Sequence, residues 1–256
     1  MSYDVRQSLL VAKEQLAPGI FDYRLQDAWL AGQAKPGQFL HILVPGKTLR
    51  RPISICDVDP AAQTVRIVFE VRGEGTAVLA AAQPGDVVDV LGPLGHGFAP
   101  VNQQGRALFV GGGIGVPPLL YAARQYGGNA TVILGFRNRE AIILQQDFVN
   151  AGCRVLLTTD DGSAGAKGLV TAPLEQELQQ SPAPVYACGP TPMLRGVAAL
   201  AKRYQTPCQV SLEERMGCGV GACLVCACKV RRADGSEGYL HVCKDGPVFD
   251  AQEVIW

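Results

Sequence analysis

Ala107-Leu-Phe-Val-Gly-Gly-Gly-Ile-Gly-Val-Pro-Pro118 is the stretch of the 256-residue chain that indicates most about its fold. Its first four residues form an apolar run that predicts a buried strand, and its prolines suit the first turn of a helix expected to reach Tyr126. Glycines let a backbone approach a pyrophosphate, which the N–H groups and dipole of a helix N-terminus attract. A tightly packed strand-to-helix turn gives the same pattern, so the stretch alone is weak evidence for a nucleotide site.

The chain after this stretch alternates apolar runs with helical patterns. Ala130–Phe136, Arg154–Thr159 and Pro184–Cys188 have the length of buried strands, and Glu140–Ala151 has a helical pattern. Such alternation predicts βαβ units and a parallel sheet. The last run continues into a second strand-to-helix junction, Tyr186-Ala-Cys-Gly-Pro-Thr-Pro-Met193, which strengthens the prediction of a nucleotide site. Without a ligand, the cysteine in it would simply end a buried strand.

The chain before the stretch is rich in β structure. Phe39–Pro45, Thr64–Arg72 and Asp86–Leu91 are short, β-branched or alternating runs bounded by glycine and proline. Several strands at this spacing predict a small antiparallel barrel. Within residues 1–100 the pattern predicts a helix only at Thr76–Ala82.

Two segments of the predicted barrel are candidates for holding phosphate. Arg50-Arg-Pro-Ile-Ser54 lies at a strand start, where an arginine can clamp a phosphate and a serine hydroxyl can bond a flavin edge. Arg72-Gly-Glu-Gly-Thr76 precedes the predicted helix. Each has an ordinary alternative, which is a strand with surface charge for the first and a turn with a threonine cap for the second.

The chain has nine cysteines, and four of them lie between Cys218 and Cys228. Cys218-Gly-Val-Gly-Ala-Cys-Leu-Val-Cys226 has the C-x4-C-x2-C spacing of plant-type [2Fe–2S] sites, and its glycines allow a loop to wrap a cluster. A zinc site is the alternative, but it normally offers two C-x2-C knuckles and this segment has one. Cys228 is either a buried thiol or a further ligand. The predicted cluster ligands are Cys218, Cys223, Cys226 and Cys243.

These patterns divide the chain into three units. We expect a barrel in residues 1–100, an α/β unit in 101–205 and a small cluster-binding unit in 206–256, where the helical pattern disappears.

Composition excludes some classes of protein. Lys+Arg and Asp+Glu both number 23, and this balance argues against nucleic-acid binding, which usually requires a basic excess. No apolar run approaches the roughly 20 residues needed to span a bilayer, so a membrane location is not expected. The first eight residues lack the basic-then-apolar order of a signal peptide, and we therefore expect a cytoplasmic protein.

The R-x-x-S segment, the G-G-x-G-x-x-P turn and the C-G-P-x-x-M junction occur in the order typical of the ferredoxin-reductase superfamily, which this sequence resembles. In that superfamily a β-barrel carries flavin and an α/β domain carries NAD(P). The sequence resembles more closely the electron-transfer subunits of dihydroorotate dehydrogenase B, over nearly the whole chain. The matching segments are Arg51-Pro-Ile-Ser54, Gly92-Pro-Leu-Gly-His-Gly-Phe98, Thr158-Thr-Asp-Asp-Gly-Ser163 with Lys167-Gly168, and Met216–Cys226.

The resemblance implies three cofactors: FAD, a [2Fe–2S] cluster and NAD. Arg51 would contact the FAD pyrophosphate and Ser54 the isoalloxazine, and many superfamily members have an aromatic residue where this chain has Ile53, which weakens the case for stacking there. The implied FAD residues are Arg51, Pro52, Ile53, Ser54, Val68, Phe69, Glu70, Gly75 and Thr76. The implied NAD residues are Gly111, Gly112, Gly113, Gly115, Cys188, Gly189 and Met193.

The resemblance also implies an oxidoreductase subunit of pyrimidine biosynthesis that does not oxidise dihydroorotate alone. Electrons would pass from the FMN of a catalytic subunit through [2Fe–2S] and FAD to NAD⁺, in a heterotetramer with two copies of each subunit. One alternative is an NAD(P)H–ferredoxin or sulfhydrogenase-type reductase subunit, which would differ in its partner. Another is a nucleotide-binding sensor with structural zinc, which would be colourless. NAD is expected over NADP, although Arg137 and Arg139 could receive a 2′-phosphate.

Overall fold

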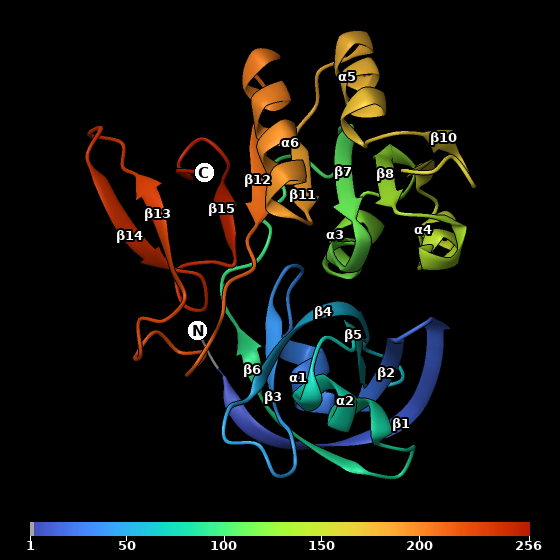
Figure 1. The fold of residues 1–256 in the computed structure, drawn as a ribbon, viewed down its shortest axis with the longest axis vertical. Helices are drawn as coiled ribbons and strands as arrows, with labels where there is room; N and C mark the ends of the chain where they lie inside the picture. Colours follow the sequence, from blue (N-terminus) through green and yellow to red (C-terminus); the bar gives the residue numbers. More distant parts are fainter. Residues whose placement is uncertain (1–2) are drawn as a thin grey trace.

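The structure, a computed structural model, describes residues 3–256. It stacks a β-barrel below a sheet covered by helices, and the C-terminal segment lies to one side of both (Figure 1). The predicted fold class is therefore confirmed, with an antiparallel barrel, a parallel-stranded α/β unit and a small C-terminal unit.

In the described part of the chain, six antiparallel strands close the barrel in the order β1-β2-β5-β4-β3-β6, and β6 pairs with β1. The barrel is filled by apolar side chains that alternate along the strands, such as Leu25, Ile42 and Ile55, none of which is exposed. The strands are β1 (Asp4–Ala17), β2 (Ile20–Gln26), β3 (Phe39–Leu43), β4 (Arg51–Asp59), β5 (Thr64–Glu70) and β6 (Val87–Leu94).

Two helices accompany the barrel. Helix α2 (Glu74–Ala81) is the predicted one, and it begins two residues earlier than the pattern indicated. Helix α1 (Ala28–Gln33) was not predicted, because six residues are too short to show a helical period. The side chain of Asp27 stabilises its first turn by accepting the N–H of Leu30.

Within residues 3–256 the second sheet has seven strands in the order β10-β9-β8-β7-β11-β12-β15, and only the edge strand β15 is antiparallel to its neighbour. The strands are β7 (Ala107–Gly112), β8 (Ala130–Phe136), β9 (Arg154–Thr159), β10 (Ala166–Lys167), β11 (Val185–Cys188), β12 (Cys208–Ser211) and β15 (Val248–Asp250). Parallel strands need helical crossovers, and these cover both faces of the sheet.

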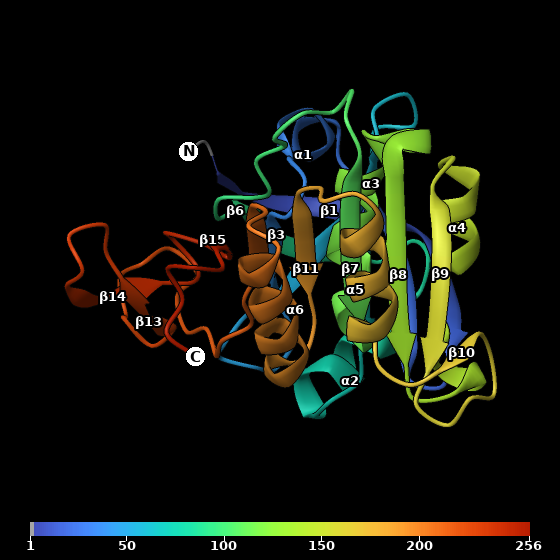
Figure 2. The ribbon, with the colours of Figure 1, turned by 90° about the horizontal axis from the view of Figure 1, so that it is seen from above.

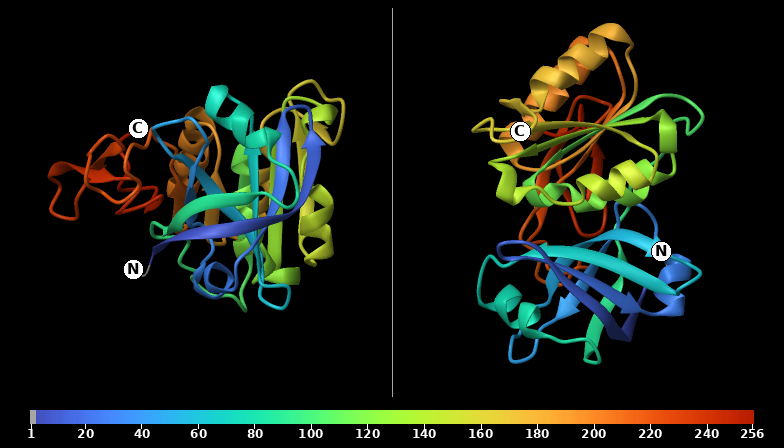
Figure 3. Two further views of the ribbon diagram at one scale, coloured as in Figure 1. Left: turned by 90° about the horizontal axis from the view of Figure 1, so that it is seen from below. Right: turned by 90° about the vertical axis from the view of Figure 1, so that its right-hand side faces the viewer.

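The helices form two layers around this sheet. Helices α3 (Pro117–Arg124) and α4 (Gln145–Asn150) lie between the sheet and the barrel, and α5 (Thr171–Gln180) and α6 (Thr191–Arg203) lie on the far face (Figures 1 and 3). The helix predicted at Glu140–Ala151 is a 3-10 turn followed by α4. The 3-10 turns are Gly113–Gly115, Gly127–Asn129 and Arg139–Ala141.

The C-terminal segment contributes to all three parts of the molecule. Strands β13 (Ala227–Arg231) and β14 (Glu237–His241) form a hairpin that projects sideways (Figure 2), whereas β12 and β15 pair with each other inside the large sheet. Phe39 and Leu94 of the barrel pack against Val242 and Cys243 of this segment. The division predicted at residue 205 stays a prediction, and strands from beyond it complete the sheet.

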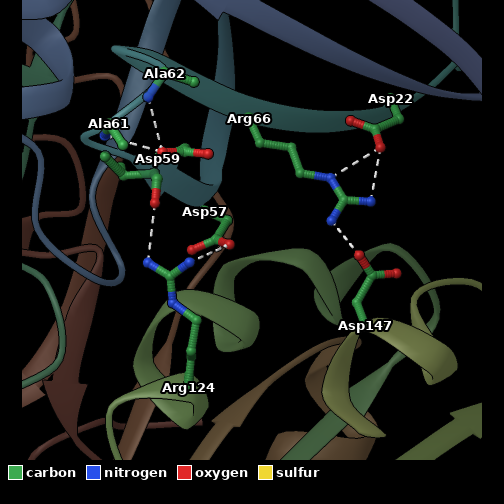
Figure 4. A network of polar contacts seen from close by, with 9 residues as sticks. Asp22, Asp57, Asp59, Ala61, Ala62, Arg66, Arg124 and Asp147 are labelled. Carbon is green, nitrogen blue, oxygen red and sulfur yellow. Dashed lines mark hydrogen bonds and ion pairs between the residues drawn. The ribbon is translucent and has the colours of Figure 1, made fainter. Parts of the chain in front are cut away.

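An ionic network joins the barrel to the helices above it (Figure 4). Arg66 on β5 bonds the Asp22 carboxylate through two nitrogens, at 2.8 and 2.7 Å, and reaches Asp147 on α4. Arg124 on α3 bonds Asp57 on β4 at 2.8 Å. Side chains of the barrel thus pair with side chains of both helices that face it, and these pairs fix the orientation of the two units.

No helix among residues 3–256 is long and apolar enough to cross a membrane. The cytoplasmic location stays a prediction.

Candidate functional site

A cleft of about 170 Å³ lies where the barrel, the sheet and the segment before the cysteine loop meet. Its barrel wall contains Pro52, Ile53, Ser54, Val68, Phe69 and Glu70. Its opposite wall contains Gly115, Cys188 and Gly189. The structure therefore brings together, across one cleft, residues that the sequence predicted separately for a flavin and for a nicotinamide dinucleotide.

Arg51 and Gly75, the two predicted phosphate contacts, are neighbours. A methyl group on Gly75 would stand only 2.3 Å from Nε of Arg51 and 2.5 Å from its Nη2, so the guanidinium lies directly on the first turn of α2. Arg51 Nη1 donates to the carbonyl of Leu49 at 2.6 Å, which orients the side chain. A guanidinium beside a helix N-terminus forms a positive site that fits a pyrophosphate.

The side chain of Thr76 takes part in the turn that precedes α2. Its hydroxyl oxygen accepts the N–H groups of Arg72 and Gly73, at 2.9 and 3.3 Å, and so caps its own turn. The capping alternative therefore describes this side chain. A contact of residue 76 with phosphate would have to come from its backbone N–H and stays a prediction.

The two strand-to-helix turns of the α/β unit pack against each other. A methyl on Gly112 would lie 2.6 Å from Sδ of Met193, and one on Gly115 would lie 2.5 Å from the carbonyl oxygen of Cys188. These two glycines are required by packing, which is the alternative explanation for the motif. Gly113 is different, because it has a φ of 53° and nothing within 4 Å of its missing side chain. Open space for a ligand lies beside Gly113. Gly111, which precedes these glycines, lies one residue before the end of β7, opposite Cys188.

Cys188 lies at the end of β11 in the cleft wall. Burial raises the pKa of its thiol to about 12, so the group is neutral at pH 7. It can border a nicotinamide as a small uncharged side chain.

All four predicted cluster ligands accept backbone N–H groups at sulfur. Cys218 Sγ accepts from Val220, Ala222 and Cys223 at 3.2–3.4 Å. Cys223 Sγ accepts from Cys218, Cys243 Sγ from Gly221 and Cys226 Sγ from Cys243, at 3.4, 3.2 and 3.4 Å. N–H groups directed at sulfur stabilise thiolates, which are the form that binds metal. The loop is thus built to hold four thiolates.

The electrostatics of Cys218 show this effect most clearly. Burial raises the pKa of its thiol, but the N–H groups of Val220, Cys223 and Ala222 outweigh burial and lower the pKa to about 6. The donor set of this loop therefore fits an iron–sulfur cluster.

The spacing of the cysteines bears on the zinc alternative. In residues 3–256 no three His, Cys, Asp or Glu side chains converge as they would around a single ion. Four thiolates around two irons enclose a larger centre than four around one zinc, so the spacing suits a cluster better.

Cys228 lies outside this arrangement. It is on β13 opposite Leu240, and its side chain joins the apolar cluster between the barrel and the C-terminal unit. Burial raises the pKa of its thiol to about 11. Of the two alternatives predicted for Cys228, these surroundings fit a buried thiol.

One wall of the cleft was not predicted from the sequence. Glu213 and Glu214, in the segment between β12 and the cysteine loop, line the cleft, and Arg72 pairs with Glu213 at 3.1 Å and with Glu70 at 2.7 Å. The sequence signal that could have identified this wall is the pair of adjacent glutamates, which directly follows a buried strand and precedes the cysteines.

Solved structures share this fold. The chain matches the structure of an NADH-dependent reduced ferredoxin–NADP oxidoreductase, described for flavin-based electron bifurcation, with a TM-score of 0.86 and 32% identity over 98% of this chain and 90% of that one. It also matches ferredoxin–NADP⁺ reductase from Plasmodium falciparum, with a TM-score of 0.65 and 13% identity over 78% and 91% of the two chains. With the cleft and the cysteine loop, the fold defines an electron-transfer protein of the ferredoxin-reductase type.

Sequence relatives identify the family. Residues 213–255 match the iron–sulfur cluster binding domain of dihydroorotate dehydrogenase B. The chain is 46% identical to the electron transfer subunit of dihydroorotate dehydrogenase B (NAD(+)) from Geobacillus thermodenitrificans over 258 residues, with 96% of each covered. It is 41% identical to that of Streptococcus mutans over 253 residues, again with 96% of each covered. The chain belongs to the family of electron-transfer subunits of NAD-dependent dihydroorotate dehydrogenase B.

Family membership confirms the predicted oxidoreductase class and the role in electron transfer and pyrimidine biosynthesis, with an iron–sulfur cluster, FAD and NAD as cofactors. It also removes the basis for a sensor with structural zinc.

Proposed function

We propose that this chain holds FAD on the barrel wall of the cleft and NAD(H) on the opposite wall, with a [2Fe–2S] cluster on the cysteine loop. The observation that carries the proposal is the single cleft lined both by Pro52–Ser54 of the barrel and by Gly115, Cys188 and Gly189 of the sheet. When bound, these groups would supply a conversion between two-electron hydride chemistry and one-electron transfer.

Different residues of the barrel wall would hold different parts of the flavin. The Arg51 guanidinium, above the first turn of α2, would hold the pyrophosphate, and the backbone of Val68–Glu70 would hold the isoalloxazine edge together with the Ser54 hydroxyl. The apolar side chain of Ile53 would exclude water from the ring. These side chains orient the flavin and carry no proton in the reaction.

Cys218, Cys223, Cys226 and Cys243 would ligate the cluster. N–H···S contacts link these cysteines in two pairs, because Cys218 and Cys223 exchange them and Cys226 accepts one from the N–H of Cys243. Each pair would serve one iron. The backbone N–H groups around the sulfurs would disperse the negative charge of the thiolates.

The chain would work with a catalytic dihydroorotate dehydrogenase subunit, as the names of its relatives indicate. We propose that this partner carries FMN, that electrons leave the FMN through this chain to NAD⁺, and that two copies of each subunit assemble. The isolated chain should reduce artificial dyes with NADH and form no orotate. Adding the catalytic subunit should give NAD-linked dihydroorotate oxidation, and Cys223→Ser should block it. Orotate formation by the isolated chain would contradict the proposal.

A reductase that exchanges electrons with ferredoxin is the second candidate, because the solved structure of such an enzyme covers 98% of this chain. The partner distinguishes the two functions. Capture by the tagged chain of an FMN protein that oxidises dihydroorotate supports the first, and ferredoxin-dependent NADPH formation in a complex without that partner supports the second.

A further inference from the structure

His41 lies between the two predicted redox sites and belongs to neither predicted set. It is on β3, where its backbone partner on β4 is Pro52, in the middle of the proposed flavin segment. Its side chain has no exposed surface and packs against the cysteine loop. A methyl on Gly219 would stand 2.5 Å from Nδ1 of His41, so the imidazole touches the backbone directly after Cys218.

The imidazole is also unsatisfied. Neither ring nitrogen makes a hydrogen bond of normal geometry with the described residues, and the nearest polar groups are in the backbone of Cys218 and of Arg50. A histidine carries at least one N–H in either protonation state, and a buried donor without a well-placed acceptor is destabilising. A purely packing role would be filled at lower cost by an apolar side chain, so the ring indicates an acceptor that the loop supplies when it holds its cluster.

We propose that His41 is a positioning residue that seats the Cys218–Gly219 turn by donating its Nδ1–H toward that turn in the cluster-bound state. One residue would thereby connect the flavin wall of the barrel, through its sheet pairing with Pro52, to the first ligand of the cluster. The inference rests on the proposed function, because it requires the cluster to be bound at Cys218. Hydrogen bonding and solvent exclusion around a cluster set its reduction potential, so this contact would tune the potential as well as the geometry.

Three variants of the full chain test the proposal. His41→Leu removes both ring nitrogens and keeps an apolar side chain, whereas His41→Asn retains an amide N–H near the position of Nδ1. Leu43→Asn is the matched control, because Leu43 follows on the same face of β3 but is 37% exposed. The measurements are iron and sulfide per chain, and the g-values and midpoint potential of the cluster in a titration followed by electron paramagnetic resonance.

We expect His41→Leu to shift the cluster potential to a more negative value and to change the g-values, and we expect His41→Asn to restore most of both. Leu43→Asn should match the wild type. If His41→Leu cannot retain iron, retention by His41→Asn supports the proposal, and equal loss in both variants overturns it. Wild-type potential and g-values in His41→Leu also overturn it. A wild-type chain without iron would instead refute the proposed function, so the two failures are distinguishable.

Discussion

Gly75 and Gly113 lie in two loops that the sequence predicted to bind phosphate, but they are glycines for different reasons. A side chain at residue 75 would displace the guanidinium of Arg51, whereas residue 113 has open space and a positive φ. The sequence pattern identified both loops because glycine is a local signal. It did not show that Arg51 lies on the α2 turn, because that contact joins two separate segments of the barrel.

Replacing Arg51 tests the proposed flavin site most directly. Arg51→Ala removes a charge-assisted phosphate contact worth about 1.5–3 kcal/mol, which corresponds to FAD retention weakened about 10- to 100-fold. Fluorescence of released flavin during dialysis measures the change. Arg24→Ala, an exposed arginine on β2, is the matched control and should retain FAD. Unchanged retention in Arg51→Ala would show that the pyrophosphate binds elsewhere.

Cys228 provides a test within the cysteine segment. We expect Cys228→Ser to keep its full content of iron and sulfide, because the thiol is packed in an apolar cluster on β13. Cys223→Ser should lose most of the cluster, because it removes one of the four ligands. Iron analysis and visible absorbance under anaerobic conditions compare the two variants. An equal loss of iron and absorbance in both variants would indicate that Cys228 is a ligand of the cluster.

Arg139 bears on the choice between NAD and NADP. Its guanidinium donates to the carbonyl of Ser163 at 2.7 and 3.1 Å, and its N–H donates to the Ser163 hydroxyl at 2.8 Å, so the side chain is held by the loop after β9. We expect dye reduction to be faster with NADH than with NADPH in the wild type. Because the guanidinium is already bonded to a backbone carbonyl, Arg139→Ala should leave the preference for NADH unchanged. A wild-type preference for NADPH would contradict this assignment.

At the scale of elements, β3, β5 and β6 were predicted from short β-branched or alternating runs, whereas β1 and β2 were not. Strand β1 was missed because polar side chains interrupt its pattern. Ser8 is fully buried and bonds Asp27, and Lys13 donates to the carbonyls of Ala80 and Ala82, at 2.8 and 2.9 Å, at the end of α2. Such polar contacts depend on tertiary structure, so a search for apolar alternation cannot find them. The same holds for His41 and Glu213 at the site.

The pairing of Arg66 on β5 with Asp22 on β2 should contribute strongly to stability. Arg66→Ala leaves Asp22, whose side chain is 4% exposed, without its cationic partner, and we expect a loss of about 3–5 kcal/mol in the free energy of unfolding. Urea unfolding measures it. Arg124→Ala should cost only about 1 kcal/mol, because its guanidinium is 41% exposed. Replacing Arg66 and Asp22 together by leucine should recover most of the loss, and equal losses in all three variants would contradict the argument.

The pair of Arg124 and Asp57 should make the stability of the folded chain depend on pH. Burial, which outweighs the N–H of Val58 and the charge of Arg124, raises the pKa of Asp57 above its ordinary value of 3.8. A carboxyl with a raised pKa in the folded state contributes stability below its unfolded pKa and loses it as pH rises through the folded value. The stability of the wild type relative to Asp57→Asn should therefore fall as pH rises from below 4 toward neutrality. A difference that increases with pH would contradict this sign.

At the scale of the whole molecule, the C-terminal unit is part of the structure that carries the flavin. Gly95 of the barrel lies so close to Gly246 that a methyl on it would be 2.6 Å from that carbonyl oxygen, and Pro247 next to it lines the cleft. The sequence predicted three successive units, because its pattern changes twice, from strands to alternating strands and helices and then to a cysteine-rich segment. The return of the chain into the sheet after the cysteines could not be read from composition, since β15 has only three residues.

Removing residues 213–256 should therefore damage more than the cluster. The truncation deletes β15, the partner of β12, and uncovers Phe39 and Leu94 on the barrel. We expect poor solubility or a markedly lower thermal midpoint, whereas full-length Cys223→Ser should stay soluble and bind FAD. A soluble truncated chain with an unchanged midpoint and bound FAD would show that the units are independent.

The late position of β15 also has a consequence for biosynthesis. The β12 edge of the sheet receives its partner only after the ribosome has translated the cysteine segment and β15. Until then the nascent chain presents an unpaired strand edge, which is a template for association with other chains, next to thiols that are open to oxidation. The yield of functional subunit in a cell should therefore depend more on prompt translation of β15 and timely delivery of iron and sulfide than on how fast the barrel folds.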